Sequence, residues 1–167
     1  MPALSRTAIR NGLVTTVLLA ACAQDRVAGP TGPTLPKSLG PQAGYYYGDQ
    51  GCTPGYWKNH TTLDPWYYLP GQNVGVFDVP DEFGLDNVTL LEALSLPGGP
   101  GELGAAQILL RAAVAALLNA ASPAVDYPLF ESDVISLVNA ALASGDRDTM
   151  LDLAGQLDYY NNLGCPL

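Results

Sequence analysis

One stretch of the chain, residues 102–121, constrains the fold most strongly. It contains the run AAQILLRAAVAALLNAA, which is rich in helix-forming residues and apolar on almost every face of a helix. Such a helix is usually the buried centre of a bundle, because none of its faces is suited to water. Gln107, Arg111 and Asn119 interrupt it too often for a membrane span. We therefore expect a helical domain built around this segment.

The charge within that run is expected to have a structural role. Arg111 is the single charged residue between residues 105 and 121. Its aliphatic stem can pack on apolar neighbours while the guanidinium reaches water or a carboxylate, such as Asp126 or Glu131. We expect Arg111 to snorkel or to form such a pair.

A short helix is predicted on the N-terminal side of the central one. Apolar residues recur at helical spacing over residues 90–96. Asp86 or Asn87 is expected to cap this helix, and the run Pro97-Gly98-Gly99-Pro100 ends it. Strand signals are few and are confined to residues 73–79.

Two more helices are predicted on the C-terminal side. One opens at Glu131 or Ser132 and closes at Gly145, and the next is capped by Asp146 and continues toward Gly164. Short connections between helices favour antiparallel neighbours. The predicted fold class is therefore mainly α, a compact antiparallel bundle of about four helices.

A second distinctive stretch is GCTPGYWKNH, residues 51–60. Thr53 before Pro54 is a helix-start signal, since threonine can cap with its hydroxyl and proline loses no helical hydrogen bond at the first position. A short helix over residues 54–60 would place Tyr56 and His60 on one face.

Aromatic residues concentrate around this stretch, where residues 45–68 hold eight of the chain's fourteen. Flat aromatic faces beside amide and carboxylate groups suit sugar rings, which stack through their C–H faces and hydrogen-bond through their hydroxyls. The same residues could instead form a loop-rich lid packed over the helices. Both interpretations stay open. The ligand-binding candidates are Tyr56, Trp57, Lys58, Asn59, His60 and Trp66.

Residues 51–60 also resemble the opening signature of an uncharacterised bacterial secreted module, the CTPGYWKNH domain. Three later stretches are similar to it as well: RAAVAALLNAA (111–121), VNAALASGD (138–146) and LDYYNNLGCPL (157–167). The resemblance covers residue 51 to the C-terminus and implies an extracellular or cell-surface location. Such modules often carry a histidine after the arginine, where this chain has Arg111-Ala112. That difference argues against a site of two histidines.

The N-terminus has the pattern of an export signal. Arg6 and Arg10 precede a short apolar run, and residues 19–22 read Leu-Ala-Ala-Cys, which resembles a bacterial lipoprotein signal. The resemblance implies lipidation of Cys22 and anchoring to the cell envelope, at the outer membrane or cell surface. The alternative is an ordinary secretory signal cut near Ala21 or Ala23.

Three segments follow from these signals. Residues 1–21 are the expected signal peptide, residues 22–44 a lipidated tether rich in proline and glycine, and residues 45–167 one folded module. From Cys22 onward the chain has five basic and sixteen acidic residues, a net charge of −11. Such a surface repels phosphate, so binding to nucleic acid is not expected.

If Cys22 is lipidated, two cysteines remain for an oxidising compartment, Cys52 and Cys165. A disulfide between them would tie the aromatic-rich N-terminal segment to the C-terminus. A zinc site is the competing use of these thiols, but two cysteines with His60 supply only three ligands. We expect the disulfide and no metal cofactor.

Other chemistry is weakly supported. Asp78, Asp81, Glu82 and Asp86 could bind calcium, but their spacing does not fit a twelve-residue calcium loop. The sequence has no GxSxG or HExxH motif and one histidine. We therefore expect a noncatalytic lipoprotein that binds a glycan or another envelope component. The alternatives are a structural or assembly protein and a hydrolase centred on His60.

Overall fold

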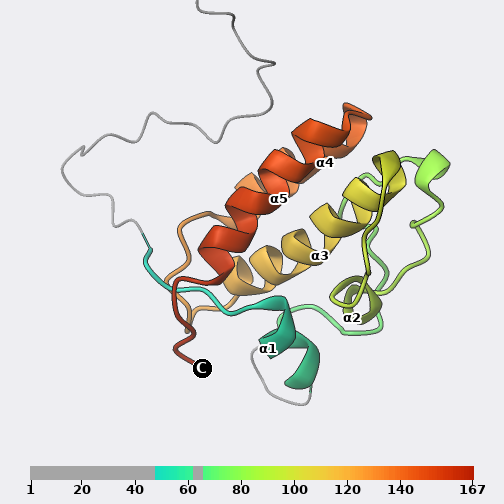
Figure 1. The fold of residues 1–167 in the computed structure, drawn as a ribbon. Helices are drawn as coiled ribbons and strands as arrows, with labels where there is room; N and C mark the ends of the chain where they lie inside the picture. Colours follow the sequence, from blue (N-terminus) through green and yellow to red (C-terminus); the bar gives the residue numbers. More distant parts are fainter. Residues whose placement is uncertain (1–47, 62–65) are drawn as a thin grey trace, which may run out of the picture.

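The computed structural model describes residues 48–61 and 66–167 and confirms a mainly helical fold (Figure 1). The five α-helices in these ranges are α1 (Pro54–Asn59), α2 (Leu90–Ala93), α3 (Gly101–Ala121), α4 (Glu131–Ala143) and α5 (Arg147–Asn161), with one 3-10 turn, η1 (Asp81–Phe83). The predicted signal peptide, lipidated Cys22 and tether lie outside the described residues. Residues 45–47 of the predicted module do too.

Helix α3 is the centre of the fold, as its apolar composition predicts. It contacts all four other helices, α1, α2, α4 and α5. Its residues from Ala112 to Asn119 are all buried. Contrary to the expectation from its polar residues, α3 is long and apolar enough to cross a membrane, but 72% of its most apolar window is buried inside the protein. Its apolar surface is therefore used for packing on all sides.

The three long helices run up, down and up. At the start of α5, Arg147 donates hydrogen bonds to the Gly99 and Gly101 carbonyls at the start of α3. At the other end, Asn119 of α3 donates to Asn161 of α5. Helices α3 and α5 are therefore parallel along their whole length, and α4 returns antiparallel to both (Figure 1).

The charge inside α3 has a different partner from the one predicted. Arg111 is half-buried, and its guanidinium donates to the Leu96 carbonyl oxygen, 2.8 Å away. Leu96 lies just beyond α2, so this bond ties the α2–α3 connection to the central helix. The predicted carboxylate Glu131 accepts a hydrogen bond from Tyr68 instead.

The predicted helix before α3 is shorter than expected, a single turn. Its cap is Thr89, and not Asp86 or Asn87, because the Thr89 hydroxyl accepts from the Glu92 amide while the Glu92 carboxylate accepts from the Thr89 amide. Among the described residues, the predicted strand over 73–79 is reduced to an isolated bridge between Asn73 and Thr89.

The C-terminal helices follow their predicted signals closely. The Asp146 carboxylate accepts from the Thr149 amide at the start of α5. Gly145 has φ 61°, a left-handed conformation that glycine adopts without strain, and it reverses the chain between α4 and α5. Helix α4 begins at Glu131, as predicted, with Asp133 accepting from the Phe130 amide.

The predicted disulfide joins Cys52 to Cys165 and closes a loop across 113 residues. Beside it the Gly51 amide donates to the Gly164 carbonyl, at 3.0 Å. Gly51 has no room for a side chain, since a Cβ there would lie 2.0 Å from the Tyr160 carbonyl oxygen. The N-terminal segment is therefore pressed against the end of α5, and glycine permits the close approach.

A buried hydrogen-bond network lies next to the disulfide. The Asn119 Oδ1 accepts from the Cys52 amide and the Trp57 indole, and its Nδ2 donates to the Cys52 carbonyl and to Asn161 Oδ1. Asn161 Oδ1 also accepts from the Tyr127 hydroxyl. Both asparagines are fully buried. Asn119 thus uses every donor and acceptor of its amide, which is what makes its burial tolerable.

We predict that Asn119→Ala lowers the free energy of unfolding by about 3 kcal/mol, because buried partners of the amide lose their hydrogen bonds. Chemical denaturation followed by circular dichroism measures this change. Asn162→Ala is the matched control, since that exposed amide bonds only to the Asp158 carbonyl of its own helix. A loss for Asn119→Ala as small as the control's would contradict the structural role of the network.

We expect loss of the disulfide to lower the free energy of unfolding by more than Asn119→Ala does. The chain-entropy model gives about 4–5 kcal/mol for a loop of this length. Denaturation curves of Cys52→Ser/Cys165→Ser and of the oxidised wild type measure the difference, with the reduced wild type as a second comparison. Equal midpoints for oxidised and reduced protein would show that the bond adds no stability.

Candidate functional site

Helix α1 carries most of the predicted ligand-binding candidates. The Thr53 hydroxyl accepts from the Tyr56 amide and caps the helix, as predicted. Trp57 is the one buried residue of α1, with 0% of its side chain exposed. Trp57 is therefore corrected from a ligand-binding candidate to a core residue, because its indole faces α3 and bonds to Asn119 at 3.0 Å.

The neighbouring aromatic rings pack on Trp57. Tyr56 meets it edge-on with ring centroids 5.5 Å apart, and Trp66 does so at 6.3 Å. Trp66 is half-buried, and its indole nitrogen is buried without a hydrogen-bond partner among the described residues. This cluster behaves as the packed lid that the sequence left open as an alternative.

The other α1 candidates are engaged within their own helix. The His60 ring stacks on Tyr56, with centroids 4.1 Å apart, and its Nδ1 donates to the Tyr56 carbonyl. The Asn59 amide donates to the Gly55 carbonyl at 2.7 Å. Lys58 is exposed. Tyr56, Lys58, Asn59 and His60 therefore lie together on α1. The Trp57 ring, which would be the largest stacking surface there, is buried.

The hydrolase alternative depends on a carboxylate beside His60. The nearest candidate in the sequence is Asp64, which lies outside the described residues. The side-chain interactions of His60 in the described ranges are those with Tyr56. The stacking and the hydrogen bond with Tyr56 fix the His60 ring at the end of α1.

Two of the four acidic side chains considered for calcium, Asp78 and Asp86, have other partners. The Asp78 carboxylate accepts from the Asn139 amide of α4, while the Asn139 oxygen accepts from the Asp78 backbone amide. Asp86 accepts from Asn87. Across the part of the chain that the structure describes, no three histidine, cysteine or acidic side chains converge as metal ligands.

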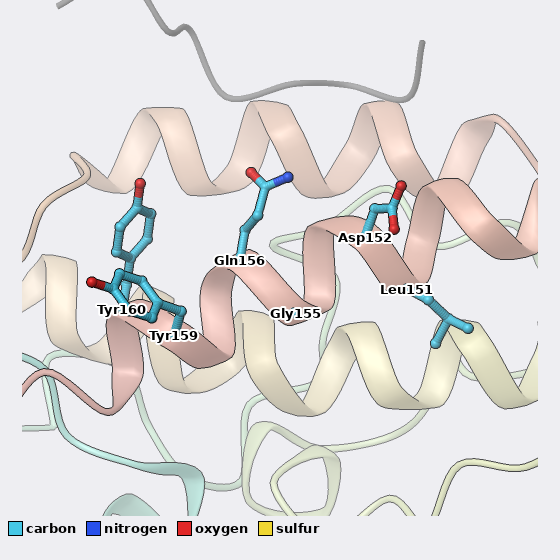
Figure 2. A pocket seen from close by; sticks show the side chains of 6 residues that line it. All are labelled: Leu151, Asp152, Gly155, Gln156, Tyr159 and Tyr160. Atoms are coloured by element: carbon cyan, nitrogen blue, oxygen red, sulfur yellow. The ribbon is translucent and has the colours of Figure 1, made fainter. Parts of the chain in front are cut away.

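An open groove lies on the outer face of α5 (Figure 2). Its volume is about 440 Å³. The residues that line it are Leu151, Asp152, Gly155, Gln156, Tyr159 and Tyr160. The groove therefore combines a carboxylate, an amide and two aromatic rings along one helix.

Glycine creates the floor of the groove. Gly155 is exposed in the middle of α5, and a Cβ built there would meet no atom within 4 Å. Figure 2 shows Asp152 and Gln156 projecting from the same side of the helix, with the two tyrosines at its C-terminal end. A small residue thus leaves a hollow between longer polar and aromatic side chains.

The two tyrosines of the groove differ in role. Tyr160 packs edge-on against Tyr127, with centroids 6.3 Å apart, and is held half-buried. Tyr159 is 67% exposed and tilts over Tyr160 at 5.7 Å. Tyr160 thereby supports a neighbouring ring whose face is available to a ligand.

Sequence reasoning missed both this groove and the buried amide network. The signals were an asparagine in an otherwise apolar helix, at position 119, and a glycine inside a helical pattern, at position 155. The asparagine does not reveal its partners, because these are set by the packing of α1 and α5 on α3. The glycine does not reveal the hollow, because the sequence does not show that this face of α5 stays uncovered.

A second feature near α1 is the link between Tyr68 and α4. The Tyr68 hydroxyl donates to a carboxylate oxygen of Glu131 at the start of α4. Burial, together with this hydrogen bond and the negative charge of Glu131, raises the pKa of Tyr68 to about 12. The adjacent Tyr67 and Leu69 are exposed. Tyr68 therefore anchors an otherwise exposed loop.

Comparison with protein-family models, with curated proteins and with solved structures finds no match for this chain.

The Tyr68 link predicts a dependence of stability on alkaline pH. The phenol has a pKa near 10 in the unfolded chain and about 12 in the folded one, so its stabilising effect is complete below pH 10. That effect is lost as the pH rises from 10 to 12. In denaturation curves over this window, Tyr68→Phe should lose stability less steeply than the wild type. Parallel pH profiles for the two proteins would contradict the assignment.

Proposed function

We propose that this protein is a noncatalytic lipoprotein of the bacterial cell envelope, anchored through Cys22, whose helical module binds a glycan in the α5 groove. The observation that carries the proposal is the lining of that groove. Sugar rings bind through aromatic stacking combined with hydrogen bonds from amides and carboxylates. Tyr159, Gln156 and Asp152 present these three groups along one open face.

The α5 groove meets the chemical requirement better than the α1 surface does. Helix α1 turns its largest ring inward, whereas α5 leaves Tyr159 mostly exposed above a hollow. The length of the groove suits a short oligosaccharide, since residues 151–160 span about 14 Å along a helix. The ligand would lie along the helix axis, with a ring on Tyr159 and hydroxyls near Gln156.

Export and anchoring belong to the same proposal. They are supported by the signal-like sequence before Cys22 and by the disulfide, which is typical of proteins that fold in oxidising compartments. An acidic, extracellular module with an open glycan groove would hold envelope polymers close to the membrane surface. A structural or assembly role is the outcome to which a failed binding test would point.

Gly155→Leu tests the groove without weakening the fold. A leucine fills the hollow and replaces the glycine in mid-helix, so the free energy of unfolding should rise by about 0.5–1 kcal/mol. Binding should fall, because the floor of the groove is occupied. Isothermal titration calorimetry of the full-length protein in detergent, with soluble envelope oligosaccharides, measures the affinity, and chemical denaturation measures the stability.

Two further variants locate the site. Tyr159→Ala should weaken oligosaccharide binding about fivefold, in line with the loss of one stacking ring. Lys58→Ala should leave it unchanged, and a loss with this variant alone would place the site on α1. Absence of binding by the wild type, together with a size that grows with concentration in gel filtration, would replace glycan binding with assembly.

A further inference from the structure

The α5 groove is acidic at one end and aromatic at the other. Asp152 lines it, and the exposed Asp148 lies one turn earlier on the same face of the helix. Tyr159 and Tyr160 lie at the opposite end. Asp152 and Tyr159 are seven positions apart, which corresponds to about 10 Å along the helix axis.

No lysine or arginine of the described residues forms an ion pair with these carboxylates. The lysine and arginine residues in the described ranges are Lys58, Arg111 and Arg147. Lys58 is on α1, Arg111 bonds to the Leu96 carbonyl, and Arg147 bonds to the Gly99 and Gly101 carbonyls. The groove therefore presents negative charge on a protein that is acidic overall.

From this charge pattern we infer that the groove selects oligosaccharides with free amino groups over acetylated or acidic ones. The inference rests on the proposed glycan-binding function and specifies its ligand class. A protonated amine would meet the carboxylate of Asp152, while another ring of the same chain stacks on Tyr159. Aromatic faces also attract cations, so both ends of the groove favour positive charge.

Acidic polymers are disfavoured by the same arrangement. A uronic acid or phosphate placed over residues 148–152 would face two carboxylates without a compensating cation among the described residues. An N-acetylated sugar keeps the stacking on Tyr159 and the hydrogen bonds of Gln156 but loses the attraction to Asp152. Affinity should therefore decrease from amino to acetylated to acidic sugars.

The test compares three probes: glucosamine oligosaccharides from chitosan, their N-acetylated counterparts from chitin, and oligogalacturonate. Calorimetry uses the full-length protein in detergent, at mildly acidic pH and low salt. For an exposed charge pair, Asp152→Asn should reduce affinity for the amino form about threefold, and this loss should exceed the loss of affinity for the acetylated form. Added salt should reduce the difference in affinity between the amino and acetylated forms. Asp158→Asn is the matched control, because it removes the same charge from α5 outside the groove lining.

The outcomes separate the two proposals. Binding of amino and acetylated forms with equal affinity, or an Asp152→Asn effect no larger than that of Asp158→Asn, would overturn amine selection and leave glycan binding in place. Preference for oligogalacturonate would overturn it as well. If no probe binds, both proposals fail.

Discussion

The buried amide of Asn119 is the interaction on which the rest of the structure depends. An amide inside an apolar helix is costly unless its hydrogen bonds are satisfied, and here the four partner groups belong to three residues in two separate parts of the chain. Those partners determine which residues of α1 and α5 lie beside the end of α3. The network therefore specifies the relative placement of these elements, beyond any stability that it adds.

The disulfide and the network act on the same residue. Cys52 is bonded covalently to Cys165, and its backbone amide and carbonyl are both bonded to Asn119. Their combined effect is to turn α1 into a plug, with Trp57 inserted against α3. The most distinctive stretch of the sequence is thus used to close the domain. The outer face of α5, by contrast, keeps Asp152, Gly155 and Tyr159 exposed.

Local signals explain why much of the fold could be predicted. Periodicity defined α3, α4 and α5, and the Thr53 and Asp146 caps were correct because a helix cap depends on residues within one turn. The two cysteines that remain once Cys22 is set aside allow one pairing, Cys52 with Cys165. The cap of α2 was assigned wrongly, since Asp86, Asn87 and Thr89 are all capable residues and only the reciprocal bond with Glu92 distinguishes them.

Long-range features could not be predicted in the same way. A helix of six residues is too short for periodicity to show which aromatic ring faces inward, so Trp57 and Tyr56 were indistinguishable. The bond between Asn119 and Asn161 joins residues 42 positions apart, and its existence depends on the parallel packing of α3 and α5. The groove lacks a side chain at Gly155, and the exposed ring of Tyr159 at its end packs on Tyr160.

The position of the disulfide also has a mechanical consequence. Gly48 lies four residues before Cys52, and the C-terminal Leu167 lies two residues after Cys165. A pulling force applied between Gly48 and Leu167 therefore acts close to both cysteines. The sulfur–sulfur bond would carry that load directly. The helices between the two cysteines are therefore shielded from stretching, and the oxidised domain can bear a pull on its ends while its interior stays folded.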